Sequence, residues 1–150
     1  MTPVTETEWS YLADTVMGGV SEGSGRIEDG ALRLTGTVST ENRGGFIQVR
    51  TDVDGLPAEA GGLRIRVRGD GQPYFIHLRT TRTRLPWQFY QARFDTSVDW
   101  REVDLQWAEF RRSGRLLLAD LRPEDIRSIG LVAYGRDHEA DVSMKAFGWF

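Results

Sequence analysis

Hydrophobic and polar positions alternate with a period of two along much of this chain. From Gly62 to Arg68, Leu63, Ile65 and Val67 fall on one side and three arginines on the other. This pattern is typical of a β-strand with one buried face. Similar runs predict strands at residues 31–36, 45–50, 74–79, 88–94, 101–105, 128–134 and 141–149.

Turn-forming residues separate these runs at short intervals. Glycine-containing turns are expected at residues 29–30, 54–55, 69–71, 113–114 and 135–137. The best helical candidate, residues 117–126, contains Pro123 and predicts no more than a single turn ahead of the next strand. Many short strands without a helix long enough to cover a sheet predict an all-β sandwich or barrel.

Length and composition indicate one domain. A chain of 150 residues can bury on folding roughly 70% of the surface that it exposes when unfolded, which is enough for one hydrophobic core. Because the chain has no cysteine, packing rather than disulfides must stabilise the fold. We expect residues 1–8 to be a flexible, dispensable segment and residues 9–150 to form a single domain.

Charge is unevenly distributed along the chain, although the net formal charge is only −3. Residues 61–94 hold seven arginines and a single acid, Asp70, whereas residues 1–60 hold four arginines and ten acids. A basic segment attracts anions. The alternative is that the acidic flanks neutralise it once the chain is folded.

The sequence offers little for catalysis. Neither His77 nor His138 lies in a spacing typical of metal binding or of serine activation, and no nucleophile elbow or phosphate-binding loop occurs. We therefore expect no enzyme, no cofactor and no resident metal. Calcium at a loop carboxylate such as Asp14 or Asp70 is the alternative. A pair of catalytic carboxylates leaves no local signature, so an enzyme stays a third hypothesis.

Features that the sequence lacks lead to expectations on cellular location, membrane insertion and nucleic-acid binding. No secretion signal and no apolar stretch of ~20 residues, the length of a membrane helix, occurs in the chain. We expect a cytoplasmic protein without membrane insertion. Basic and aromatic residues alternate between Thr80 and Trp87, but the acidic net charge and the lack of a recognised motif argue against nucleic-acid binding.

The stretch from Asp14 to Ser21 is unusually apolar and rich in glycine for a loop. Gly18 and Gly19 permit positive φ or close backbone approach, while Asp14 and Ser21 suit hydrogen bonds to loop amides. One interpretation is an ordered connection clamped against the sandwich. The other is that Met17 and its neighbours form the rim of a binding site.

A second candidate surface follows from the alternation itself. Four predicted strands present polar or aromatic groups opposite their apolar positions: Phe46, Gln48 and Arg50; Arg64, Arg66 and Arg68; Phe75, His77 and Arg79; Phe89, Gln91 and Arg93. If the four strands share one sheet, this face suits a polar planar ligand, because guanidinium groups donate paired hydrogen bonds and rings supply stacking area. The alternative is a solvated outer face.

Several motifs together resemble a known family. They are Asp-Thr-Val-Met-Gly-Gly-Val-Ser at residues 14–21, Glu41-Asn42, Gly44-Gly45-Phe46, Val49-Arg50, the run from Arg66 to Gly71 containing Asp70, and the aromatic pair Trp87 and Tyr90. The chain from Trp9 onward resembles the complex I intermediate-associated protein 30 (CIA30) family. Asn42, Asp70, Trp87 and Tyr90 thereby join the candidate binding residues.

The resemblance implies a fold and a role. The fold is a galactose-binding-like jelly-roll β-sandwich, similar to some carbohydrate-binding modules, and eukaryotic members assist the assembly of mitochondrial respiratory complex I. No family catalytic residues match positions in this chain. Because no transit peptide or long N-terminal extension precedes the motifs, we expect a bacterial stand-alone domain.

Two functional hypotheses come first. The leading one is a non-catalytic binding or assembly module that contacts protein partners, respiratory-complex subunits among them, through the loop at residues 14–21 and its neighbours. The alternative is a module that binds a glycan or small polar ligand on the polar sheet face around Arg50, Arg66, His77 and Gln91.

Overall fold

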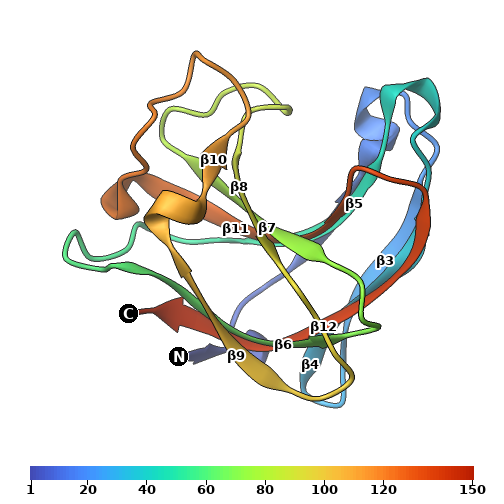
Figure 1. Ribbon diagram of the computed structural model, residues 1–150, viewed down its shortest axis with the longest axis horizontal. Coiled ribbons are helices and arrows are strands. Elements are labelled where there is room, and N and C mark those ends of the chain that lie inside the picture. The colour runs from blue at the N-terminus through green and yellow to red at the C-terminus, as the bar shows by residue number, and fades with distance from the viewer.

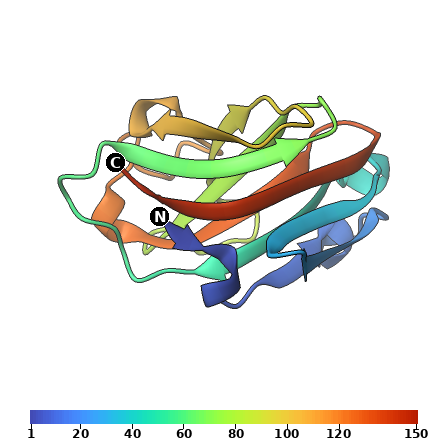
Figure 2. The same cartoon turned by 90° about the horizontal axis from the view of Figure 1, so that it is seen from below.

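Two six-stranded antiparallel sheets pack face to face in the computed structural model, which describes residues 1–150 (Figures 1 and 2). Sheet A has the order β3 (Glu22–Glu28), β4 (Ala31–Val38), β12 (His138–Trp149), β6 (Gly62–Gly69), β9 (Arg101–Gln106), and β1 (Thr2–Pro3) also pairs with β12. Sheet B has the order β10 (Arg111–Arg112), β8 (Tyr90–Phe94), β7 (Tyr74–Thr80), β11 (Ile126–Tyr134), β5 (Phe46–Asp52), β2 (Ser10–Ala13). The predicted all-β jelly-roll sandwich is confirmed.

The two inner faces share one hydrophobic core. In β6 the predicted apolar positions Leu63, Ile65 and Val67 are all fully buried. They belong to the same buried cluster as Ile76 of β7 and Leu131 of β11 in the opposite sheet. Close packing of two alternating faces in this way is what stabilises a sandwich without disulfides.

The connections agree with the expected turns. Asp29 and Gly30 both have positive φ, 52° and 77°, as a tight hairpin between β3 and β4 requires. The helical segments are short 3-10 turns: η1 (Val4–Glu6), η2 (Asp14–Met17), η3 (Glu41–Arg43), η4 (Trp107–Glu109) and η5 (Pro123–Asp125). The single turn expected at Pro123 is η5. No helix in the protein is both long enough and apolar enough to cross a membrane.

The alternating sequence pattern does not reveal strand β3. In β3 the outer positions are mostly exposed and no apolar position is buried. Two of its residues, Gly23 and Gly25, instead let β3 lie against its neighbours, since a Cβ at Gly23 would overlap the Thr35 carbonyl and one at Gly25 the Val49 side chain. A polar, glycine-containing edge strand carries no hydrophobic alternation, so only its partner β4 reveals it.

Residues 1–8 are not separate from the domain. Thr2 and Pro3 pair with Phe147 and Ala146 of β12, and Val4 is fully buried in the core. The indole nitrogen of Trp9 donates a hydrogen bond to the Val4 carbonyl at 2.9 Å. Residues 2–4 are therefore packed against the domain, where we expected a flexible segment, while the dispensability of residues 1–8 stays a prediction. A two-residue strand has too few positions for alternation to be recognised, and its burial depends on the distant β12.

Candidate ligand-binding groove

The outer face of sheet B gathers polar and aromatic side chains from four neighbouring strands. Gly130 of β11 lies opposite Arg50 of β5 on one side and His77 of β7 on the other, and His77 lies opposite Gln91 of β8. Partners in register place their side chains on the same face. The structure thus brings together three predicted contacts, Arg50, His77 and Gln91.

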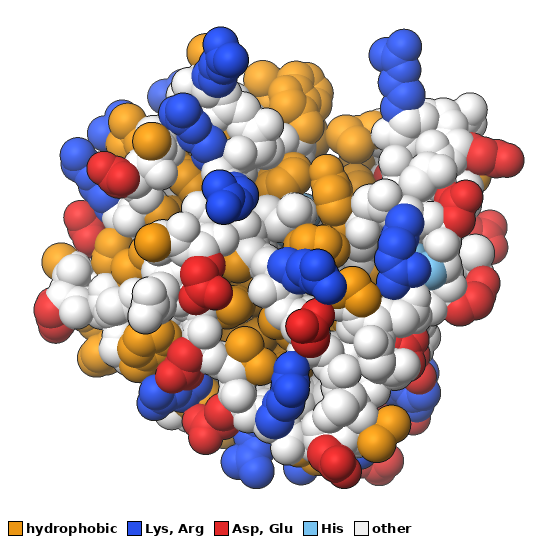
Figure 3. All heavy atoms as spheres, in the orientation of Figure 1, with side chains coloured by type: hydrophobic (Ala, Val, Ile, Leu, Met, Phe, Trp, Pro, Cys, Tyr) orange, Lys and Arg blue, Asp and Glu red, His pale blue; other side chains and the backbone are white.

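This face is hollowed into a groove made of two adjoining cavities of about 230 Å³ and about 360 Å³. In the orientation of Figure 1, the space-filling view is notched at the top between two projecting lobes, with apolar side chains in the notch (Figure 3). Both cavities are lined by Phe46, Gln48, His77, Pro86 and Phe89. The first extends toward Arg50, Arg79 and Ser128, and the second toward Met17, Trp87 and Tyr134.

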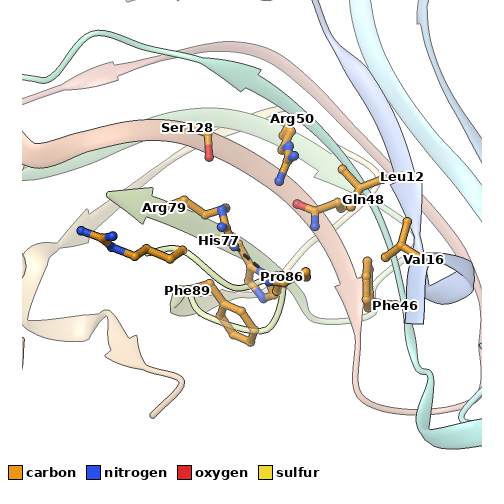
Figure 4. Close-up of a pocket in the computed structure, with 11 residues that line it drawn as sticks. Leu12, Val16, Phe46, Gln48, Arg50, His77, Arg79, Pro86, Phe89 and Ser128 are labelled. Atoms are coloured by element: carbon orange, nitrogen blue, oxygen red, sulfur yellow. Dashed lines mark hydrogen bonds between the residues drawn. The ribbon is translucent and has the colours of Figure 1, made fainter. Parts of the chain in front are cut away.

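His77 is the centre of the groove floor (Figure 4). Its ring stacks on Phe89 with centroids 4.0 Å apart and planes 8° from parallel, and the edge of Tyr134 completes the cluster at 5.3 Å. Its Nε2 lies 2.7 Å from Oε1 of Gln91. Burial lowers the pKa of His77 to about 4, against the smaller opposing effect of Gln91. The imidazole is therefore neutral at pH 7 and acts as a fixed hydrogen-bonding group.

Gly130 makes room for the floor. A Cβ at this position would lie 2.6 Å from Oε1 of Gln48, so the Gln48 amide occupies the space that a side chain would fill. In Figure 4 the Gln48 amide and the guanidinium ends of Arg50 and Arg79 point toward the same region of the groove. The missing side chain of Gly130 thus places a polar amide beside two cations.

The β7–β8 connection, residues 81–89, forms one wall. Nη1 of Arg79 donates hydrogen bonds to the carbonyls of Leu85 at 3.0 Å and Gln88 at 2.8 Å. The Gln88 side chain accepts from the backbone N–H groups of Arg84 and Leu85. These contacts hold the connection in one arrangement. Trp87, with 57% of its surface exposed, lies on this wall beside the second cavity.

Asp14 organises the opposite wall. It is fully buried, and its carboxylate accepts hydrogen bonds from the Ser21 N–H at 3.0 Å, the Ser21 hydroxyl at 2.6 Å and the Gly45 N–H at 2.6 Å. The Phe46 N–H adds a longer one at 3.3 Å. One side chain therefore joins the stretch at residues 14–21 to the stretch at residues 39–50.

Neighbouring glycines allow this arrangement. A Cβ at Gly19 or at Gly44 would overlap the Asp14 carboxylate, and Gly18 adopts the left-handed conformation with φ 87° that ends η2. Burial raises the pKa of Asp14, but the hydrogen bonds from Ser21, Gly45 and Phe46 together lower it below its usual value. Asp14, Gly19 and Ser21 therefore have structural roles, while Val16 and Met17 line the groove.

The sequence motifs at residues 14–21 and 41–50 are the segments that Asp14 joins. A profile of the complex I intermediate-associated protein 30 family matches residues 2–145. The chain belongs to the CIA30 family. The two glycine-containing stretches that carry the family resemblance are those that meet at Asp14. A comparison with curated proteins found no match.

Solved structures with the same fold as this CIA30 protein include carbohydrate-binding modules and parts of larger agarases. The family 11 module of a cellulosomal cellulase of Clostridium thermocellum superposes with a TM-score of 0.77 at 12% identity, over 95% of this chain and 86% of that one. The same module in complex with a β-1,3-1,4-mixed-linked tetrasaccharide gives 0.73 at 13% identity, over 95% and 88%. A family 30 module gives 0.57 at 12% identity, over 88% and 92%.

One predicted grouping in this CIA30 protein is wrong. Strand β6 belongs to sheet A, so Arg66 and Arg68 lie on the opposite side of the sandwich from Arg50 and His77. The guanidinium of Arg68 instead lies 4.7 Å from the ring centroid of Trp100. Alternation determines which residues of a strand share a face, but not which sheet the strand joins.

Tyr90 is a second correction. It is almost fully buried and its hydroxyl donates to the Leu118 carbonyl at 2.6 Å, so it faces the core and not the groove. Tyr90 and Gln91 are consecutive in β8, and consecutive residues point to opposite faces. Trp87, three residues earlier, lies in the connection, where strand alternation does not apply.

Asn42 and Asp70 lie outside the groove. Asn42 has positive φ, 56°, within η3, a conformation that asparagine tolerates better than most residues. The Asp70 carboxylate accepts hydrogen bonds from the Gln72 N–H at 3.2 Å and the Tyr74 hydroxyl at 3.0 Å. As with Asp14, its oxygens are occupied by protein donors. No group of three or more metal-ligating acid or histidine side chains gathers anywhere in the protein.

The structure also adds residues that the predicted set lacks. Phe46, Gln48, Arg79 and Phe89 line the groove, and alternation had placed all four on the polar face. Tyr134 of β11 had no such signal. The outward positions of β11 are Ser128, Gly130, Val132 and Tyr134, which do not contrast with its apolar inward positions. Only the pairing of β11 between β5 and β7 reveals its place under the groove.

Proposed function

We propose that this CIA30 protein is a non-catalytic binding module that holds an oligosaccharide segment in the groove of sheet B. The observation that carries the proposal is the combination in one groove of fixed hydrogen-bonding groups with aromatic rings. Gln48 and His77 form the polar floor, where Gln91 holds His77 through a hydrogen bond, while Phe89 and Trp87 stand on one wall. Sugar hydroxyls need such donors and acceptors, and the C–H faces of sugar rings pack on aromatic rings.

Two further observations support this proposal. The same fold occurs in a Clostridium thermocellum module solved with a mixed-linked tetrasaccharide. Neither cavity is lined by an Asp or Glu side chain, whereas most glycosidases work with a pair of carboxylates across the scissile bond. The groove therefore has the groups for binding a chain but not that pair for cleaving one.

Calorimetric titration with a panel of oligosaccharides tests the proposal. We expect at least one oligosaccharide to bind, and Trp87→Ala to weaken it by up to about tenfold, because packing on an aromatic ring contributes on the order of 0.5–1.5 kcal/mol. Arg66→Ala, on the opposite sheet, is the matched control and leaves binding unchanged. The proposal fails if no oligosaccharide binds, or if Trp87→Ala and Gln48→Ala both bind as tightly as the unaltered protein.

A second candidate function is contact with a protein partner, respiratory complex I subunits being the class that the family description suggests. It is favoured by exposed apolar side chains on both sides of the groove. Val16, Met17 and Val20 are 62%, 40% and 43% exposed on one side, and Leu85 is 41% exposed on the other. Exposed apolar residues gathered around a concavity are typical of interaction sites.

Affinity purification from the native host tests this second candidate. We expect a reproducible partner that Val16→Asp releases and Val98→Asp retains, since Val98 is 76% exposed but lies on the distant connection before β9. Recovery of no partner, or equal recovery with both variants, would count against a protein-binding role for this rim.

A further inference from the structure

The charges around the groove are all of one sign. The two cavities are lined by four arginines, namely Arg43, Arg50, Arg79 and Arg84, and by no acidic side chain. The protein as a whole carries a net formal charge of −3. The groove is thus a positively charged concavity in an acidic protein, and a concavity of one sign concentrates ligands of the other.

These arginines have no counterions within the protein. Arginines elsewhere form ion pairs, for example Arg33 with Asp141 at 2.8 Å and Arg64 with Asp104 at 2.7 Å. None of the four groove arginines forms one. The Arg50 side chain also donates no hydrogen bond within the protein, although it is half-buried. Its guanidinium is free to bind a ligand.

Arg50 and Arg79 are close enough to repel each other. Burial, and then the positive charge of Arg50, lower the pKa of Arg79 from its usual value. The two side chains reach the same space from β5 and β7 on either side of β11 (Figure 4). Two like charges held together without a counterion destabilise the empty groove, and an anion between them removes that repulsion.

The nearest acids do not neutralise this pair. Asp52 lies two positions beyond Arg50 on the same face of β5, and Glu8 lines a separate shallow cavity together with Arg50. Neither forms an ion pair with Arg50. Neither acid lines the groove, so the space toward Gln48 and His77 holds only positive and neutral groups.

We propose that the groove selects acidic oligosaccharides, with the carboxylate of a hexuronate residue bound between Arg50 and Arg79. This inference rests on the proposed oligosaccharide-binding function and names the class of sugar. A guanidinium matches the planar carboxylate with two parallel hydrogen bonds. The charged end of the groove adjoins the ring-lined end at Phe89 and Trp87, so an acidic sugar and its neighbour in the chain meet charge and stacking in succession.

The experiment compares matched saccharides by calorimetric titration at low and at high ionic strength. The probes are an oligogalacturonate, the same oligomer with its carboxylates methyl-esterified, a neutral gluco-oligosaccharide and a sulfated oligosaccharide of equal length. We expect the acid form to bind at least about tenfold more tightly than its ester at low salt, since each charge-assisted hydrogen bond is worth about that factor. Salt should reduce this preference.

Variants locate the preference. Arg50→Gln keeps a polar side chain but removes the charge, so we expect it to abolish the preference for acid over ester while ester binding remains. Arg66→Gln on the opposite sheet is the matched control and retains the preference. The thermal unfolding of both variants is measured alongside, so that a folding defect is recognised as such.

Each result has a defined meaning. Binding of neutral and acidic oligomers with equal affinity overturns the acidic preference but leaves the proposed binding function standing. Tighter binding of the sulfated chain than of the uronate overturns the carboxylate assignment. If no saccharide binds but an oligoglutamate peptide does, and Arg50→Gln abolishes that binding, both the inference and the oligosaccharide function are overturned in favour of an acidic protein segment.

Discussion

Asp14 is the residue whose side chain joins the two sequence motifs. Its carboxylate accepts four hydrogen bonds, two from Ser21 and one each from the N–H groups of Gly45 and Phe46. The Asp14→Asn variant replaces one acceptor oxygen by a donor and leaves buried N–H groups unpaired. We expect a loss of about 1–3 kcal/mol in the free energy of unfolding, measured by urea denaturation. Asp95→Asn, at an exposed ion pair, is the control and changes stability by less than about 0.5 kcal/mol.

The same carboxylate makes stability depend on pH. Hydrogen bonds from Ser21, Gly45 and Phe46 outweigh the effect of burial and lower the pKa of Asp14 in the folded state. In the unfolded chain its pKa is about 3.9. Its stabilisation is therefore fully present at neutral pH and declines as the pH falls below about 5 and through the folded-state pKa. Urea denaturation across this range should show the difference between the native protein and Asp14→Asn shrinking. A constant difference would contradict this account.

Gly44 tests whether the close approach to Asp14 matters. A Cβ there would overlap a carboxylate that four hydrogen bonds hold in place, so Gly44→Ala has to displace the carboxylate. We expect a loss of about 1–3 kcal/mol by chemical denaturation, as for other overpacked sites. Gly114→Ala is the matched control, because a Cβ at Gly114 meets nothing within 4 Å. Equal stability of the two variants would show that Asp14 shifts freely.

Among elements, the β7–β8 connection depends most on a single side chain. Arg79 holds it through the carbonyls of Leu85 and Gln88. In Arg79→Met we expect the backbone amides of Arg84, Leu85, Trp87 and Gln88 to exchange with solvent deuterium at least about tenfold faster, because opening loses hydrogen bonds worth about 1–3 kcal/mol. Arg84→Met in the same connection removes a guanidinium that makes no hydrogen bond, so its exchange should match that of the unaltered protein. Unchanged exchange in Arg79→Met would mean that Gln88 alone orders this wall.

Some strands could be predicted from the sequence pattern and others could not. Strands β5, β7 and β8 were predicted with their outward faces correct, because each alternates apolar with polar or aromatic residues. Strands β1 and β3 were not, since β1 has two residues and β3 lies at an edge without a buried apolar position. Strand β1 is placed by pairing with β12, at the other end of the chain. Strand β3 is placed by pairing with β4, and of these two only β4 shows the alternating pattern.

For the whole molecule, the occupied carboxylates predict stability that is independent of calcium. The oxygens of Asp14 and Asp70, the two loop acids considered as calcium ligands, accept hydrogen bonds from protein donors. We expect the thermal unfolding midpoint to stay the same with a chelator and with added calcium, measured by differential scanning calorimetry. A midpoint that rises with calcium concentration would indicate a site that binds the folded state.

Local chemistry along the chain was enough to predict several features of this protein. Period-two alternation set the buried and outward faces of most strands, the Asp29-Gly30 pair set a hairpin, and the motif at residues 14–21 identified the family. Tertiary structure decided which strands share a sheet. It separated Arg66 and Arg68 from His77, brought Tyr134 and Gly130 beneath the groove, and showed Asp14 to be a structural group. The physical reason is that side-chain direction repeats within a strand, whereas strand pairing and groove shape depend on contacts between segments far apart in the chain.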